Sequence, residues 1–268
     1  MSQCIRRRAP ARCPVSTRAI PKQAATVILL RRAEPKGFEV FLTRRPDSMP
    51  FLGGMYCYPG GTVRKEDCSP VVIGRCFGLT RERARTIVGA QFSPEQAVGI
   101  WVAGVRELFE EVGVLLAVDE SGGRLAMNSA RASRLADKHR LMMSEALNFL
   151  SLIEGENLRC DLLRLAYFSR WQTPAQVSTR FDTYFFLAAM PDDQTPLPIS
   201  SEVAHSLWLT PDSALQRFSR GELPMIFPTF SALRTLADFD TLDSVFREYF
   251  RDRWQPSIGV TGSFTRER

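Results

Sequence analysis

The chain has 268 residues, 44% hydrophobic and 24% charged, and this composition is typical of a globular protein. No run of about 18 apolar residues occurs, so the sequence predicts no membrane span, and a net charge of +6 without a recognisable binding motif does not predict a nucleic-acid-binding protein. Six cysteines without a Cys-x-x-Cys pair and only two histidines exclude the usual zinc sites and favour reduced thiols in a cytoplasmic protein.

The first segment of the chain is basic. No acidic residue precedes Glu34, whereas arginine is frequent from Arg6 onward. We predict a disordered basic tail over residues 1–21. The alternative is a transit peptide, which would place a eukaryotic protein in mitochondria or peroxisomes, although Pro10 and Pro14 disfavour the amphipathic helix that such peptides form.

Two strands are predicted next, at Ala24–Leu30 and Phe38–Thr43. The segment Glu34-Pro35-Lys36-Gly37 between them is rich in turn formers, so we expect a hairpin. Arg44–Gly61 contains many glycines and prolines and is expected to be a loop. A short helix is predicted at Thr80–Val88.

The best-marked helix begins after Ser93. Ser93 is a good N-cap residue, Pro94 suits the first helical position and Gln96 completes a capping box. We expect this helix to end at Val112, because Gly113 can adopt the left-handed conformation that terminates helices.

The remaining chain mixes strands and helices. Their order predicts an α+β fold or an α/β fold with a mixed sheet, and it disfavours a doubly wound parallel sheet. In chain order we expect a strand at Val114–Val118, one long amphipathic helix at Arg131–Ile153, strands at Leu163–Trp171, Phe181–Met190 and Val203–Leu209, and helices that begin at Pro211 and cover Ser231–Asp238 and Leu242–Tyr249.

Three carboxylates share one face of the helix that begins after Ser93. Glu107, Glu110 and Glu111 are related by three and four residues, and like charges at this spacing destabilise a helix. A divalent cation would reverse that effect, and oxygen ligands without thiols or imidazoles suit Mg²⁺ or Mn²⁺. The alternative is a solvated acidic face on which Arg106 and Glu110 form an ordinary ion pair.

The same helix resembles the Nudix family, whose signature is G-x5-E-x7-R-E-U-x-E-E-x-G-U with U aliphatic. Gly61 matches its first glycine, and Arg106-Glu107-Leu108-Phe109-Glu110-Glu111-Val112-Gly113-Val114 matches its second half. Arg106 lies 45 positions after Gly61 instead of 14, so 31 extra residues interrupt the signature. Glu66 or Asp67 would replace the middle glutamate, since Asp67 has the expected offset from Gly61.

The interruption is similar to that of the Nudix subgroup typified by the mitochondrial and peroxisomal coenzyme A diphosphatase. The resemblance covers roughly residues 22–240. It implies a Nudix-type α/β/α sandwich around a mixed β-sheet, with a helical insertion inside the Nudix box. We therefore expect one domain over residues 22–250, insertions at about 62–91 and 125–160, and a C-terminal tail at 251–268. Segments that agree with the subgroup include Arg44-Arg45-Pro46, Tyr58-Pro59-Gly60-Gly61, Trp171-Gln172-Thr173-Pro174 and Arg180-Phe181-Asp182-Thr183.

The resemblance also implies a metal-dependent site. Glu107, Glu110 and Glu111 would bind Mg²⁺ or Mn²⁺, and Glu110 would belong to the catalytic group as well. Arg106 is expected to orient a carboxylate rather than contact the substrate. Glu202, in a loop late in the domain, is the candidate general base, with a plain surface role as its alternative.

Substrate contacts are expected from the segment that precedes the box. Arg44 and Arg45 could hold a phosphate by bidentate contacts, and Phe51 offers apolar surface. Gly60 and Gly61 would let the backbone approach the metal or the phosphate closely. The expected partner is a nucleotide-linked small molecule, without nucleic acid or membrane, and a homodimer is compatible with the sequence.

The leading interpretation is hydrolysis of coenzyme A or acyl-coenzyme A to 3′,5′-ADP and 4′-phosphopantetheine. ADP-ribose, NADH and dinucleoside polyphosphates are alternatives with the same chemistry, and RNA-cap removal is a weaker one. A non-catalytic Nudix-like ligand sensor belongs to a different class. Such sensors usually lose box carboxylates, whereas this chain keeps all three on the helix.

Overall fold

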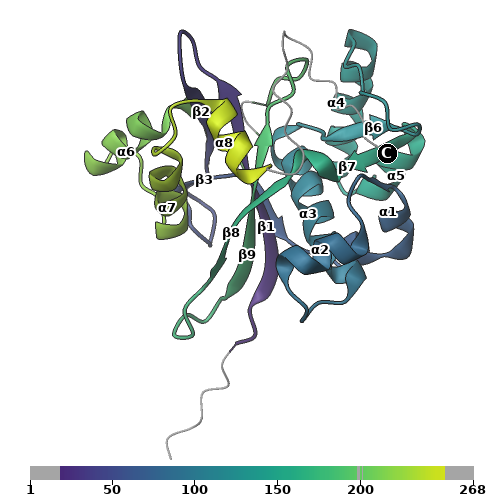
Figure 1. Cartoon of the computed structure of the whole chain (residues 1–268), viewed down its shortest axis with the longest axis horizontal. Helices are drawn as coiled ribbons and strands as arrows, with labels where there is room; N and C mark the ends of the chain where they lie inside the picture. Colours follow the sequence, from purple (N-terminus) through teal and green to yellow (C-terminus); the bar gives the residue numbers. More distant parts are fainter. Residues whose placement is uncertain (1–18, 198–199, 201, 251–268) are drawn as a thin grey trace, which may run out of the picture.

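The structure, a computed structural model, describes residues 19–197, 200 and 202–250 (Figure 1). The tails predicted at 1–21 and 251–268 therefore lie outside the described residues, except for 19–21. In chain order the elements are β1 (Lys22–Arg32), β2 (Phe38–Arg44), β3 (Tyr56–Cys57), β4 (Gly60–Thr62), the 3₁₀ turn η1 (Glu66–Cys68), α1 (Pro70–Gly74), β5 (Cys76–Phe77), α2 (Arg81–Val88), α3 (Pro94–Val112), β6 (Ala117–Asp119), α4 (Ser129–Met143), α5 (Phe149–Gly155), β7 (Leu158–Asp161), the 3₁₀ turn η2 (Leu162–Arg164), β8 (Ala166–Gln172), β9 (Phe181–Ala189), β10 (His205–Leu209), α6 (Pro211–Ser219), α7 (Phe227–Leu236) and α8 (Leu242–Tyr249).

The main sheet is mixed. Within the described part of the chain its strand order is β10-β2-β1-β9-β8, with β3 paired to β2 and β4 paired to β1. β1 and β9 run parallel over nine residue pairs, whereas β1 runs antiparallel to β2 and β4. A small second sheet has the order β5-β7-β6. The predicted mixed-sheet α/β class is confirmed.

The central strand β1 is buried on both faces. Val27 and Leu29 belong to the core shared with α3, whereas Ile28 and Leu30 belong to the core shared with the C-terminal helices. Successive strand residues point to opposite faces, so this alternation requires helices on both sides of the sheet. Figure 1 shows α1 to α5 on one side and α6 to α8 on the other. The result is the expected α/β/α sandwich.

The predicted hairpin forms between β1 and β2, with Leu30 opposite Val40. The expected loop over Arg44–Gly61 is wrong at two places, because β3 and β4 lie within or across it. β3 pairs with the end of β2, and β4 pairs with the start of β1, where β1 and β2 do not pair with each other. A pattern of turn-forming residues does not indicate such pairing.

Helix α3 begins and ends where the sequence predicts. The Ser93 hydroxyl accepts a hydrogen bond from the Gln96 backbone (3.1 Å), and the Gln96 side chain accepts one from the Ser93 backbone (2.9 Å). Gly113 ends the helix in the left-handed region with φ of 70°. Almost the whole of α3 is buried, because the sheet lies on one side and the inserted segments on the other.

The insertion inside the box, residues 62–91, consists mainly of η1, α1 and α2 packed along α3. Thr80 caps α2 as its sequence suggests. The single helix predicted at Arg131–Ile153 is wrong: α4 ends at Met143 and α5 begins at Phe149. Asn148 caps the second helix, and Glu145 adopts a positive φ of 58°, which an α-helix does not allow.

Three predicted strands begin later than expected, and the one expected at Val203 begins at His205. The strand expected at Val114 begins at Ala117, because the side-chain amide of Gln194 bonds both the N–H and the C=O of Leu115 at 2.9 Å in place of a neighbouring strand. The strand expected at Leu163 begins at Ala166, after the 3₁₀ turn η2. Strand β7 was not predicted. Over the residues described, no helix has the length and apolar character needed to cross a membrane.

Candidate active site

The glycine turn between β3 and β4 places the backbone directly against α3. A Cβ on Gly61 would lie 2.6 Å from the carboxyl carbon of Glu107, and a Cβ on Gly60 would lie 2.4 Å from the carbonyl oxygen of Ala25. A side chain at Gly60 would collide with the backbone of β1, and a side chain at Gly61 would displace the Glu107 carboxylate. The Gly60 N–H also donates a hydrogen bond to the Glu111 carboxylate. The structure thus brings together four residues that the sequence predicted for one site.

Arg106 is buried among carboxylates, with 2% of its side chain exposed. Its Nε and Nη2 donate to Asp67 at 2.8 and 2.9 Å, and Nη1 donates to Glu107 at 2.7 Å and Glu110 at 2.8 Å. Nη2 also donates to the carbonyl oxygen of Thr62 at 2.9 Å. These contacts use all five N–H donors of the guanidinium. Arg106 is therefore a positioning residue, and Asp67 takes the place expected for the middle glutamate of the box.

Glu110 is held by two arginines. Arg64 makes a bidentate pair with it at 2.9 and 2.8 Å, and Arg106 donates to the same carboxylate. Arg64 is half exposed, whereas Glu110 is largely buried. Sequence reasoning missed Arg64, because 46 residues separate it from Glu110 and no local spacing connects them.

Glu107 and Glu111 are both buried, and both have a raised pKa. Burial raises the pKa of Glu107, and the adjacent Arg106 opposes this effect. Burial raises the pKa of Glu111 well above its usual value, and the negative charges of Glu107 and Glu202 raise that pKa further. A buried carboxylate whose ionised form is disfavoured by its neighbours, as Glu111 is by Glu107, is a good position for a cation.

The donor set fits a hard divalent cation. Carboxylate oxygens of Glu107 and Glu111 face the closely approaching glycine backbone, and such oxygen donors are the ligands that a hard cation prefers. Among the described residues, no three His, Cys, Asp or Glu side chains already form a metal-binding group. Glu110 is turned toward Arg64 and Arg106, so it can join the other two carboxylates only by exchanging at least one of these contacts.

Glu202 lies in the loop before β10. It is exposed, while the next residue, Val203, is fully buried in the core beside α3. Backbone hydrogen bonds between Ser200 and Val203 in both directions, at 3.0 and 3.3 Å, close the loop around Glu202. Because the charge of Glu202 acts on Glu111, the fold brings this predicted residue to the carboxylate site.

Besides the two glycines, three residues were predicted to contact substrate, and their side chains lie in different surroundings. Arg45 donates from Nε to the carbonyl oxygen of Phe51 at 3.2 Å, and its positive charge lowers the pKa of Glu111. Arg44 instead pairs with Asp47 at 2.7 Å. Phe51 is 43% exposed and stacks against Phe181 with ring centroids 5.2 Å apart. Arg45 is thus the arginine that the structure places within electrostatic reach of Glu111.

Arg180 and Asp182, in one of the segments that agree with the subgroup, do not pair with each other. Asp182 accepts two hydrogen bonds of 2.7 Å from Arg170 on the neighbouring strand. Arg180 donates to the carbonyl oxygen of Thr173 instead. In the antiparallel pair β8–β9, Arg170 lies opposite Tyr184, so Asp182 is a diagonal neighbour of Arg170. The register of the two strands therefore decides which arginine Asp182 contacts.

Comparisons with known proteins agree with these features. The family described as NUDT19 Nudix domain matches residues 85–236. A protein from Gallus gallus described as acyl-coenzyme A diphosphatase NUDT19 is 27% identical over 84% of this chain and 70% of its own length. The human protein of the same description is 27% identical over 84% of this chain and 69% of its own length. The crystal structure of a Nudix hydrolase from Alicyclobacillus acidocaldarius is similar with a TM-score of 0.67 and 25% identity, over 85% of this chain and 96% of that chain.

Proposed function

We propose that this chain, which belongs to the NUDT19 Nudix domain family and is a Nudix hydrolase, hydrolyses the diphosphate bond of coenzyme A or acyl-coenzyme A. Water would attack one phosphorus, the P–O–P bond would break, and 3′,5′-ADP and 4′-phosphopantetheine or its acyl thioester would leave. The observation that carries the proposal is the pair of buried carboxylates, Glu107 and Glu111, facing the Gly60–Gly61 turn. The substrate class follows from the description of the two relatives.

We assign Glu107, Glu110 and Glu111 as ligands of Mg²⁺ or Mn²⁺. When bound, such an ion acidifies a water molecule and neutralises phosphate oxygens. Burial of Glu107 and Glu111 supports the assignment, because ionised carboxylates in this position need a positive partner. Glu110 would exchange Arg64 for the ion while Arg106 keeps its side chain in place.

The other residues of the site would act on the proton and the substrate. Glu202 is exposed and near Glu111, so it would accept the proton of the attacking water. Arg106 would hold the carboxylates in register without contacting the substrate. Arg45 would bind a phosphate group beside Glu111, and Arg44 would assist after release from Asp47.

Phe51 would contact an apolar or aromatic part of the substrate. Its ring is partly exposed and held at a fixed angle by Phe181. Phe181 pairs with Lys22, and Gly61 pairs with Ala25, three residues further along β1. At about 3.3 Å per residue these positions lie about 10 Å apart, which a nucleotide can span.

The test is a product analysis with coenzyme A, acetyl-coenzyme A, NADH and ADP-ribose in the presence of Mg²⁺ or Mn²⁺. We expect 3′,5′-ADP from the coenzyme A substrates and no release by a Glu110→Gln, Glu111→Gln double variant. Glu145→Gln, at an exposed position in the turn after α4, is the matched control and should behave as wild type.

The outcomes separate the alternatives. Cleavage of ADP-ribose or NADH alone would retain the hydrolase and reject the coenzyme A assignment. Tight binding of one compound without turnover of any would support a ligand sensor. Loss of activity in Glu145→Gln would show that the effect of the double variant is not specific to the box helix.

A further inference from the structure

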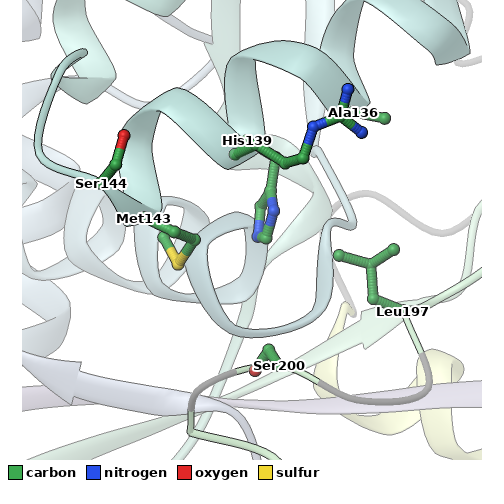
Figure 2. Close-up of a pocket in the computed structure, with 7 residues that line it drawn as sticks. Ala136, His139, Met143, Ser144, Leu197 and Ser200 are labelled. Atoms are coloured by element: carbon green, nitrogen blue, oxygen red, sulfur yellow. The ribbon is translucent and has the colours of Figure 1, made fainter.

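A cavity of about 520 Å³ lies between α4 and the loop before β10 (Figure 2). Its volume is within the range of small-molecule sites. Four of its lining residues follow one another at the spacing of a single helix face. Figure 2 shows His139 and Met143 of α4 directed toward the loop that carries Leu197 and Ser200. The lining residues are Ala136, His139, Arg140, Met143 and Ser144 from α4 and its end, and Leu197 and Ser200 from the loop.

The chemistry of the lining is mainly apolar with a few polar groups. Met143 leaves 39% of its surface exposed. His139 must donate from Nε2 to the backbone carbonyl of Glu110, 2.8 Å away, because a carbonyl oxygen only accepts hydrogen bonds. Arg140 is the one cation of the lining, and it already pairs with Asp137. Such a surface suits an uncharged chain with amide groups better than it suits phosphates.

The cavity lies beside the C-terminal turn of α3, the helix that carries the carboxylate site. The carbonyl that binds His139 belongs to Glu110, so the two sites lie within one turn of α3, about 5.4 Å along its axis. On the other side, the N–H of Leu197 donates to the carbonyl of Val112 at 2.9 Å. The loop that contributes Leu197 and Ser200 to the cavity also carries Glu202, whose charge reaches Glu111.

We infer that this cavity binds the acyl-pantetheine arm of the substrate, with the acyl chain against Ala136, Met143 and Leu197. The inference rests on the proposed function and adds where the arm lies and which residues select its length. The occupant is argued from three observations: the largely apolar surface of the cavity, the hydroxyl groups of Ser144 and Ser200 in its lining, and its place within one turn of α3 from the site proposed to hold the diphosphate.

The inserted helix α4 therefore has a role in specificity. Its apolar pattern serves two faces: Leu135 and Met142 are buried in the core, while Ala136 and Met143, one position further along, line the cavity. A substitution on the second face changes the cavity without removing core contacts. This separation makes the inference testable with variants that fold.

The experiment measures kcat/KM for acetyl-, hexanoyl- and decanoyl-coenzyme A and, separately, binding of S-decanoyl-pantetheine, which has no diphosphate. We expect wild type to prefer the longer chains. In Met143→Glu the ratio of kcat/KM for decanoyl- over acetyl-coenzyme A should fall about tenfold, which corresponds to the loss of about two buried methylene groups. Leu141→Glu, on another face of α4 and 47% exposed, is the matched control.

A second pair of variants tests volume instead of charge. Ala136→Trp should fill the cavity and weaken S-decanoyl-pantetheine binding at least about tenfold, whereas Ser133→Trp, exposed on the same helix, should not.

The outcomes distinguish this inference from the proposed function. Turnover of the coenzyme A substrates with equal chain-length ratios in wild type, Met143→Glu and Leu141→Glu would overturn the inference and keep the function. Binding of S-decanoyl-pantetheine that depends on Ala136 and Met143, without hydrolysis of any coenzyme A substrate, would keep the cavity assignment and reject the function. Equal losses in the cavity variants and their controls would overturn the inference.

Discussion

The two sides of the carboxylate cluster on α3 differ in how their charges are balanced. On one side, Arg106 uses every donor on Asp67, Glu107, Glu110 and a backbone carbonyl. On the other side, Glu111 is buried and accepts a hydrogen bond from a backbone N–H. Among the described residues, no arginine forms an ion pair with Glu111. The first side has the features of a structural ion network and the second those of a functional site, because buried charge without compensation is costly unless a ligand supplies it.

We therefore expect substitution of the box arginine and of the box glutamates to affect different properties of the protein. Removal of Arg106 should damage the fold. Removal of Glu111 should damage activity and spare the fold.

The largest effect is expected from Arg106→Met. This change leaves Asp67 and Glu107 buried without their partner, so we expect the free energy of unfolding to fall by about 3–5 kcal/mol. Urea denaturation measures it. Arg234→Met, which removes an exposed pair with Asp238, should cost less than about 1 kcal/mol. Partial recovery in the double variant Arg106→Met, Asp67→Asn would support the reason given, and equal small losses at both arginines would contradict it.

Glu111→Gln should have the next largest effect, and on function alone. We expect kcat/KM to fall by more than about 100-fold, because loss of a ligand should cost more than the roughly 10- to 100-fold that loss of a residue supporting a ligand costs. Without added metal the variant should be at least as stable as wild type, because a buried charge and its repulsion by Glu107 disappear. Thermal unfolding with and without Mn²⁺ measures the stability of the variant, and Glu120→Gln, at an exposed glutamate, is the control. A large drop in metal-free stability would place Glu111 in the structural network instead.

The raised pKa values predict a pH dependence of smaller size. The pKa of Glu111 is higher in the folded chain than the ordinary value of 4.5, so the folded state holds its proton longer than the unfolded state does. Its contribution to stability is therefore full below pH 4.5 and is lost as pH rises through the raised pKa. In metal-free protein the stability of Glu111→Gln relative to wild type should therefore increase as the pH rises from 4.5 to the raised pKa of Glu111. A difference that stays constant with pH would argue against the burial of an ionisable Glu111.

The smallest effect is expected from Arg64→Met. Arg64 is half exposed, so loss of its pair with Glu110 should change the free energy of unfolding by less than about 1 kcal/mol. Freed from this arginine, Glu110 should bind metal more readily, and calorimetric titration should show Mn²⁺ affinity raised by a few fold. Arg81→Met, whose partner Glu95 lies far along α3 from Glu110, is the control. Weaker Mn²⁺ binding in Arg64→Met would show that Arg64 supports the metal site instead of competing with it.

Local features of the sequence determined much of the fold. The limits of α3 follow from Ser93, Gln96 and Gly113, and the β1–β2 hairpin follows from two apolar runs around a turn. In each case the interacting groups are close in the chain, so their spacing carries the geometry. The face shared by Glu107, Glu110 and Glu111 follows for the same reason.

The long apolar pattern over Arg131–Ile153 shows the limit of such reasoning. Leu141, Met142 and Leu147 continue the helical periodicity. The helix is nevertheless interrupted at Glu145, and α4 and α5 pack as separate helices. Periodicity reports which side chains are buried and not whether one helix or two buries them.

The sequence alone therefore determined the box helix, its carboxylate face, the family resemblance and the sheet class. Only the tertiary structure decided that Arg64 pairs with Glu110 and that Arg170 pairs with Asp182. It also decided that a loop near residue 200 and helix α4 line an open cavity beside the box. The physical reason is that these contacts join residues whose separation along the chain carries no geometric information until the sheet register and the packing of the insertions bring them together.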